Sequence, residues 1–205
     1  MPPEKGIDLV RQNIAISKGG VEIRYQNKPS HFGTNSLVYL LLDCSGSMEN
    51  GQKFTKAKSG LLKFAKEAIS KGYSVGLIQF GSYATHLCDP QRELTIFDRS
   101  LMAMKICGST NMTDAIRLAT QKLLNKDAAK VICIVTDGFP DDPQTTLNAA
   151  QNAKQNRIDI ITIGTDDADH EFLKKLATRA ELGIKVSRNQ FEQTIASTAK
   201  MLPGK

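Results

Sequence analysis

The stretch that decides the fold is SLVYLLLDCSGS, residues 36–47. Its first seven residues form a largely apolar run, which is typical of a parallel strand buried on both faces. Asp43 follows this run directly, and Ser45 and Ser47 come two and four residues later. Gly46 permits a tight bend between the two serines. The stretch therefore predicts a buried strand that ends in a cluster of oxygen-bearing side chains.

Strands and helices alternate along the rest of the chain. Further apolar runs predict strands over residues 74–80, 84–87, 130–136, 158–163 and 184–186. Between and after these runs, apolar residues at helical spacing predict helices over residues 53–70, 97–105, 114–124, 145–155, 170–179 and 189–201. Such alternation is typical of βαβ units, in which a parallel sheet carries helices on both faces. We therefore expect an α/β fold with a doubly wound, mostly parallel sheet of about six strands.

Residues 1–35 lack this pattern, and we expect them to be an N-terminal extension to a domain over residues 36–203. Within the extension, residues 7–16 could form a short helix and residues 21–25 a strand. Residues 28–34 contain Pro, Ser and Gly and are flanked by Asn27 and Asn35, which is typical of a connection.

Composition excludes several classes of protein. The chain has 205 residues, of which 40% are apolar and 23% charged, as in an ordinary soluble globular domain. No apolar run approaches the roughly 18 residues of a membrane span, and the N-terminus does not resemble a signal peptide. The four cysteines form no CxxC pair, which argues against a zinc cluster. We expect reduced thiols and a cytoplasmic location.

The chain is basic, with 27 Lys and Arg against 21 Asp and Glu and a net charge of +6. Six lysines fall in one stretch: Lys53, Lys56, Lys58, Lys63, Lys66 and Lys71. A basic helix can bind nucleic acid. We favour a solvated helix face, because the other positions of this predicted helix are apolar. A nucleic-acid or ribonucleoprotein role through the basic helix is the alternative.

The loops that follow parallel strands meet at one edge of such a sheet, and ligands bind at that edge. Asp43 follows the first strand of the sheet, and Asp137 follows the strand over residues 130–136. Between them, the loop GSTNMTD offers Thr110 to the same edge. Carboxylate and hydroxyl oxygens suit Mg²⁺ or Mn²⁺ better than zinc or copper. Because Mg²⁺ takes six oxygens, these side chains would leave a coordination position for an outside ligand.

Three elements in this order resemble the complete metal-ion-dependent adhesion site of von Willebrand factor A domains. They are Asp43-x-Ser45-x-Ser47, Thr110 within Gly-Ser-Thr, and Asp137 within Val-Thr-Asp-Gly. The resemblance covers roughly residues 36–203 and implies a Rossmann-like sheet with one short antiparallel edge strand, here residues 84–87. It also implies that the two serines and the threonine coordinate Mg²⁺, or Mn²⁺ or Ca²⁺, directly or nearly so. The two aspartates would orient the waters of the ion and the first serine.

The resemblance implies divalent-metal-dependent protein binding, in which an Asp or Glu of the partner completes the coordination of the metal. We expect an intracellular adaptor or regulatory subunit without enzymatic activity, a small-molecule substrate or membrane contact. Cys44 departs from the family pattern, which has a polar or small residue there, and we interpret it as a small buried apolar residue.

More acidic residues follow the strand ends: Glu49, Asp141, Asp142, Asp166, Asp167 and Asp169. The first interpretation is that they are ordinary caps and turns. The second is that they form a negative rim, which would select a partner with Lys or Arg around its metal-binding acid.

Catalysis is the weakest class of function. A strand-end aspartate also accepts phosphoryl groups in haloacid-dehalogenase-like phosphatases, but those enzymes place a second acid where this chain has Ser45. The chain contains neither a GxSxG elbow nor a phosphate-binding loop of the GxxxxGK[ST] type. Metal-dependent phosphoryl transfer is therefore the least favoured function.

Overall fold

The computed structural model describes residues 15–17, 20–22, 36–165 and 167–203. The chain divides into two units, Met1–His31 and Phe32–Lys205. In the first unit, β1 (Ala15–Ser17) pairs antiparallel with β2 (Gly20–Glu22).

The sequence predictions for the first unit can be compared with the structure at only a few residues. The predicted helix over residues 7–16 is wrong at residues 15 and 16, which belong to β1. Its remainder lies outside the described residues. The predicted strand over residues 21–25 overlaps β2 at residues 21 and 22. The predicted connection and the boundary after residue 35 lie outside the described residues.

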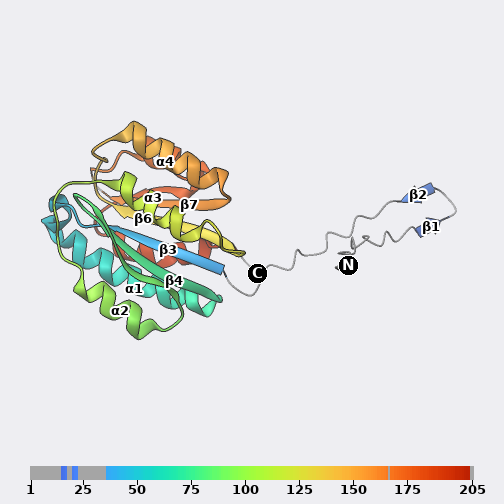
Figure 1. Cartoon of the computed structure of the whole chain (residues 1–205), viewed down its shortest axis with the longest axis horizontal. Coiled ribbons are helices and arrows are strands. Elements are labelled where there is room, and N and C mark those ends of the chain that lie inside the picture. Colours follow the sequence, from blue (N-terminus) through green and yellow to red (C-terminus); the bar gives the residue numbers. More distant parts are fainter. Residues whose placement is uncertain (1–14, 18–19, 23–35, 166, 204–205) are drawn as a thin grey trace, which may run out of the picture. The chain divides into compact units, whose positions relative to one another are not determined.

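A six-stranded sheet forms the centre of the second unit (Figure 1), and its strand order is β5-β4-β3-β6-β7-β8. The strands are β3 (Ser36–Asp43), β4 (Tyr73–Phe80), β5 (Ala84–Gln91), β6 (Ala129–Thr136), β7 (Ile158–Thr165) and β8 (Gly183–Val186). Neighbouring strands pair in parallel except β4 and β5, which are antiparallel. The predicted α/β fold with one antiparallel edge strand is confirmed.

The edge strand β5 is longer than the sequence predicts. It continues to Gln91 and passes through Pro90, whereas the prediction ends at residue 87. The pairing register with β4 shifts between Val75 and Leu77 and again between Leu77 and Ile78, which indicates bulges. An edge position explains why proline is accepted, because one side of the strand has no neighbour that needs its N–H.

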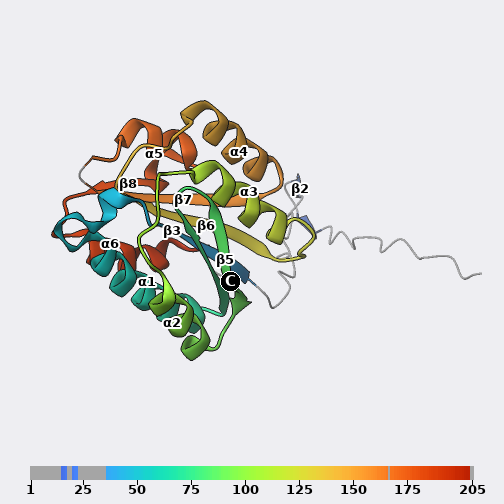
Figure 2. The ribbon, with the colours of Figure 1, turned by 60° about the vertical axis from the view of Figure 1, so that its left-hand side comes forward.

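Helices cover both faces of the sheet (Figure 2), with α1, α2 and α6 on one face and α3, α4 and α5 on the other. They are α1 (Lys53–Ser70), α2 (Leu94–Ala103), α3 (Met112–Leu123), α4 (Pro143–Gln155), α5 (His170–Leu176) and α6 (Phe191–Thr198). Short 3₁₀ helices are η1 (Gly46–Gln52), η2 (Ala180–Leu182) and η3 (Ala199–Met201). Within the described residues, none of the helices has the length and apolar character that crossing a bilayer requires.

The central strand β3 divides the core into two layers. Val38, Leu40 and Leu42 belong to the apolar cluster that contains residues of α1, α2 and α6. Tyr39 and Leu41 belong to the cluster that contains residues of α3, α4 and α5. All five side chains are fully buried. Successive side chains of the strand point to opposite faces, and both faces are covered by helices. This explains why odd-numbered and even-numbered positions of β3 are both apolar.

Helices α1 and α6 approach each other closely at Gly60. A Cβ atom on Gly60 would lie 2.9 Å from the backbone oxygen of Glu192 and 2.9 Å from the Cβ of Ile195. Both distances are shorter than an ordinary van der Waals contact, so only glycine fits without a shift of α6.

The lysines of α1 do not form a purely solvated face, and the prediction is wrong for Lys53, which is 1% exposed. The ammonium groups of Lys56, Lys58 and Lys63, and of Lys71 directly after the helix, bond to backbone or side-chain oxygens of neighbouring segments. Long lysine stems can cover a helix surface while their charged ends reach such partners. Much of the positive charge of α1 is therefore engaged within the fold.

Candidate metal site

Two buried carboxylates stand side by side at the carboxyl edge of the sheet. Asp43 is the last residue of β3, and Asp137 follows Thr136, the last residue of β6. Because β3 and β6 pair in parallel, their ends meet at the same edge. Both aspartates are 0% exposed. Two like charges without access to water are costly, so this edge needs partners that balance them.

Both oxygens of Asp43 accept a hydrogen bond from the fold. The backbone N–H of Ser45 donates to Oδ1 at 2.8 Å, and the hydroxyl of Thr136 donates to Oδ2 at 2.5 Å. Burial nevertheless raises the pKa of Asp43 to about 6, against the effect of these hydrogen bonds. The sequence argument missed Thr136 as a site residue, although it immediately precedes Asp137 and lies on the strand beside β3.

The hydroxyls of the two predicted serines connect to the second carboxylate. Ser45 Oγ lies 3.0 Å from Ser47 Oγ, and Ser47 Oγ donates to Asp137 Oδ1 at 2.7 Å. Ser45 is buried, whereas Ser47 is exposed. The structure therefore brings Asp43, Ser45, Ser47 and Asp137 together, and we call these four residues the oxygen cluster.

Thr110 reaches the same edge on a separate loop. The backbone N–H of Gly46 donates to the carbonyl of Gly108 at 3.2 Å, which joins this loop to the serine segment. The N–H of Thr110 donates to Asp141 Oδ1 at 3.1 Å, and the N–H of Asp141 donates to the Thr110 carbonyl at 3.1 Å. Thr110 is 9% exposed, and these backbone hydrogen bonds hold its loop at the carboxyl edge of the sheet. Asp141, which the sequence placed only on the acidic rim, positions this loop.

A cation that the sequence argument missed lies inside the site. The Nζ of Lys53 contacts Asp137 Oδ2, and the lysine is almost completely buried. Its position ten residues after Asp43 was visible in the sequence, but only the structure shows that its side chain turns inward.

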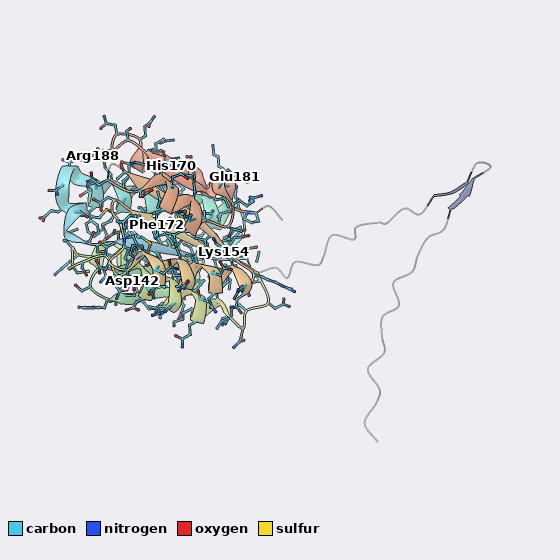
Figure 3. All side chains as sticks on the ribbon, turned by 90° about the horizontal axis from the view of Figure 1, so that it is seen from above. Asp142, Lys154, His170, Phe172, Glu181 and Arg188 are labelled. Atoms are coloured by element: carbon cyan, nitrogen blue, oxygen red, sulfur yellow. The ribbon has the colours of Figure 1, made fainter. Side chains whose placement is uncertain are left out.

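Two of the acidic residues of the rim cap helices. Asp142 accepts from the N–H of Thr145 at the start of α4 (Figure 3), and Asp169 accepts from the N–H of Phe172 at the start of α5. These contacts favour the interpretation as caps and turns for these two aspartates. Asp166 lies outside the described residues.

Two exposed aromatic side chains flank the same edge. Tyr83, in the turn between β4 and β5, is 67% exposed, and Phe139, which follows Asp137 by two residues, is 46% exposed. The ring of Phe139 packs against Phe172, with 4.8 Å between the ring centroids. Exposed aromatic residues beside a polar site are typical anchors of a protein interface.

The donor set fits a hard divalent ion. The oxygen cluster offers two carboxylates and two hydroxyls, which suit Mg²⁺ or Mn²⁺. Within the part of the chain that the structure describes, no group of three or more His, Cys, Asp and Glu side chains could hold a metal ion. A site for Mg²⁺ or Mn²⁺ here must therefore draw on hydroxyl oxygens as well, and the two serines of the oxygen cluster supply them.

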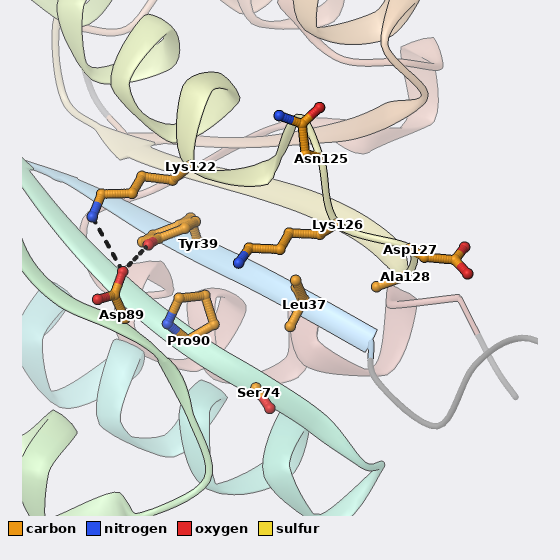
Figure 4. Close-up of a pocket in the computed structure, with 10 residues that line it drawn as sticks. All are labelled: Leu37, Tyr39, Ser74, Asp89, Pro90, Lys122, Asn125, Lys126, Asp127 and Ala128. Carbon is orange, nitrogen blue, oxygen red and sulfur yellow. Dashed lines mark hydrogen bonds and ion pairs between the residues drawn. The ribbon is translucent and has the colours of Figure 1, made fainter.

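A separate hollow of about 650 Å³ lies elsewhere on the molecule (Figure 4). Leu37 and Ser74, near the starts of β3 and β4, contribute to its lining. In it, Asp89 accepts from the hydroxyl of Tyr39 at 3.1 Å and from Lys122 at 3.3 Å. Because Leu37 and Ser74 stand at the amino ends of their strands, this hollow is at the opposite edge of the sheet from the oxygen cluster.

A mostly parallel six-stranded sheet with helices on both faces places the chain in the class of Rossmann-like α/β domains. The sequence profile of the von Willebrand factor type A domain matches residues 38–199. The chain belongs to the von Willebrand factor type A domain family.

Part of the chain is similar in sequence to a Plasmodium protein. The Thrombospondin-related anonymous protein of Plasmodium falciparum is 27% identical over 142 residues, which are 62% of this chain and 25% of that protein. The match thus spans about a quarter of the length of that relative.

Solved structures share the fold at low sequence identity. The vWF domain of the type V pili tip protein Mfa5 from Porphyromonas gingivalis has a TM-score of 0.74 and 14% identity, covering 82% of this chain and 94% of that chain. The pilus adhesin SpaC from Lactobacillus rhamnosus GG has a TM-score of 0.70 and 16% identity, covering 82% of this chain and 30% of that chain. The manganese-loaded TRAP protein of Plasmodium vivax has a TM-score of 0.66 and 21% identity, covering 80% of this chain and 72% of that chain.

Proposed function

We propose that this chain is a divalent-metal-dependent protein-binding module. Ser45, Ser47 and Thr110 would hold Mg²⁺, or Mn²⁺ or Ca²⁺, with Asp43 and Asp137 close behind them. The observation that carries the proposal is the oxygen cluster, in which side chains from the ends of β3 and β6 are joined by hydrogen bonds. When bound, the ion supplies an electrophilic coordination position that an outside carboxylate can take.

The residues around the cluster orient its oxygens before any ligand arrives. Thr136 fixes Asp43, Asp43 fixes the backbone of Ser45, and Asp141 fixes the backbone of Thr110. A ligand set that the fold already orients loses little conformational freedom on binding. Because these oxygens are already oriented, the geometry favours a binding site over a loop that is merely polar.

We propose that the partner is a protein that presents an Asp or Glu to the metal. Tyr83 and Phe139 would contact the surface around that acid, since both are exposed at the same edge. The names of two similar solved structures support the proposal. One is a pilus adhesin, which agrees with a binding role, and the other is manganese-loaded, which agrees with a metal site. The proposal assigns the site no catalytic step and no small-molecule substrate.

We further propose that the module acts in the cytoplasm as an adaptor or regulatory subunit. The four cysteines are all free, and three of them are buried. This state supports a reducing compartment, where thiols persist.

An affinity pull-down with the whole chain tests the proposed function. Partners retained in Mg²⁺ are expected to be lost in EDTA and with Ser47→Ala, because both changes remove the coordination of the acid. Asp142→Ala, which alters only a helix cap at the same rim, is the matched control and is expected to retain them. Equal retention in Mg²⁺ and EDTA would contradict the proposal.

A further inference from the structure

The candidate metal site contains its own cation. Lys53 is 1% exposed, and its Nζ contacts Asp137 Oδ2. The other oxygen of that carboxylate accepts from Ser47 at 2.7 Å. A metal ion held by the oxygen cluster would therefore share Asp137 with a lysine.

The position of this lysine is unfavourable for a helix. Lys53 is the first residue of α1, and the first turn of α1 carries no acidic residue. Helix N-termini carry partial positive charge, which disfavours a cation there. Burial of an ammonium group adds a further cost unless a carboxylate accompanies it. The pairing with Asp137 offsets both costs, so the two groups depend on each other.

Lys53 also changes the charge of the site. Counted as ionised groups, Asp43, Asp137 and Lys53 sum to one negative charge. A divalent ion would bring the sum to one positive charge, and an incoming carboxylate would then bring it to zero. Without the lysine, the metal-loaded site would already be neutral and would attract an acid less strongly.

We propose that Lys53 is a resident counter-ion, which weakens the binding of the metal and strengthens the binding of an acidic ligand to the metal-loaded site. This inference rests on the proposed function. Lys53 has a second carboxylate within reach, because its Nζ lies 4.0 Å from Asp167 Oδ2. The side chain of Asp167 is 82% exposed. It can take up the ammonium group when a metal ion engages Asp137.

The test uses the whole chain and Mn²⁺ alone as the probe. Lys53→Met is compared with wild type and with Lys66→Met, which removes one charge from an exposed position of the same helix. Isothermal titration is expected to show Mn²⁺ binding about tenfold or more tighter for Lys53→Met, because a like charge beside the ion is gone. Lys66→Met is expected to stay within about twofold of wild type. Equal Mn²⁺ affinity in all three proteins would overturn the inference.

The second half of the inference has its own measurement. Acetate is titrated into the Mn²⁺-saturated proteins, and the relaxation rate of water protons reports displacement of water from the ion. Lys53→Met is expected to need several-fold more acetate than wild type or Lys66→Met. The same acetate dependence in all three would overturn the claim that Lys53 favours acidic ligands.

Loss of folding does not prevent the test. In EDTA, Lys53→Met is expected to melt below wild type, because Asp137 loses its cation, and Mn²⁺ is expected to restore it. Lys53→Gln keeps a hydrogen-bond donor without the charge and serves where the Met variant does not fold. For either variant, the Mn²⁺ dependence of Tm gives the affinity.

The outcomes separate this inference from the proposed function. Mn²⁺ binding by wild type with no effect of Lys53→Met would overturn the inference alone. Binding by the variant but not by wild type would support the counter-ion and overturn metal-dependent function in the natural chain. Failure of both proteins to bind would overturn both.

Discussion

Asp43 ends the central strand with a carboxylate that has no exposure to water. Burial raises its pKa to about 6, from an ordinary value of 3.8. Between these two values, the metal-free folded protein binds more protons than the unfolded chain. The free energy of unfolding therefore falls as the pH rises through this window, by about 3 kcal/mol in total. At neutral pH the metal-free protein is therefore less stable because the buried carboxylate of Asp43 is ionised.

Asp43→Asn is expected to remove this pH dependence. In EDTA, the variant should be more stable than wild type above about pH 6, and the difference should shrink toward pH 4. Urea unfolding between pH 4 and 8 measures it. In Mg²⁺, wild type should gain stability and the variant should not. A variant that is less stable than wild type at pH 8 in EDTA would show that the charged form is not disfavoured.

The sequence identified the residues of the oxygen cluster because each stands at a fixed place after an apolar strand. Parallel pairing then required their ends to meet, which β3 and β6 confirm. Thr136 and Lys53 could not be assigned in this way. Their roles depend on the direction of their side chains, which the spacing of residues does not show. A lysine on a helix is also usually exposed to solvent.

At the scale of elements, two adjacent acids of the β6–α4 loop are expected to behave differently. Asp141 binds the backbone of Thr110, whereas Asp142 caps α4. Asp141→Ala should weaken Mn²⁺ binding several-fold, because the loop that carries Thr110 loses its anchor. Asp142→Ala should lower Tm modestly and leave Mn²⁺ affinity unchanged. Titration calorimetry and thermal melting distinguish them, and equal effects of both changes on Mn²⁺ binding would contradict the assignment.

The close approach of α1 and α6 predicts that Gly60 tolerates no larger side chain. Gly60→Leu should lower the free energy of unfolding by about 3 kcal/mol, because overpacking against the backbone of α6 outweighs the gain of about 0.8 kcal/mol in helix propensity. Equilibrium urea unfolding measures the change. Lys66→Leu, at an exposed position of α1, is the control and should stay within about 0.5 kcal/mol. A stable Gly60→Leu variant would mean that α6 moves freely.

Helices with a regular spacing of apolar residues can be predicted from the sequence, whereas the residues at which they end are predicted less accurately. The prediction for α1 over residues 53–70 is confirmed. Helix α5 ends at Leu176, three residues earlier than predicted. The reason is tertiary: Thr178 exchanges two hydrogen bonds with the backbone of Ile160, which draws the chain to the sheet. Local pattern carries no information about such a contact.

At the scale of the whole molecule, a bound divalent ion is expected to stabilise the fold. At a free Mg²⁺ concentration of 100 times Kd, the gain should be about 2.7 kcal/mol, or roughly 5–10 °C in Tm. Thermal melting in Mg²⁺ and in EDTA measures it. A double variant, Ser45→Ala with Ser47→Ala, should melt equally in both. A wild type with unchanged Tm would count against the metal site.

The nucleic-acid alternative predicts a different dependence on solution conditions. Binding through the lysines of α1 would fall steeply with salt and would ignore EDTA. Three of these lysines already bond to oxygens of neighbouring segments and a fourth, Lys53, is buried, so we expect weak binding of single-stranded DNA at 150 mM salt. Fluorescence anisotropy with a labelled oligonucleotide measures it. Tight binding that is lost with Lys66→Met would favour the alternative.

The two outer margins of the sheet bear on how copies of this protein can coexist. On one margin, β5 carries bulges and a proline; on the other, β8 has only four residues. Neither margin offers the long, flat row of free backbone groups on which a foreign strand can assemble. High local concentrations therefore should not drive fibril growth through this sheet.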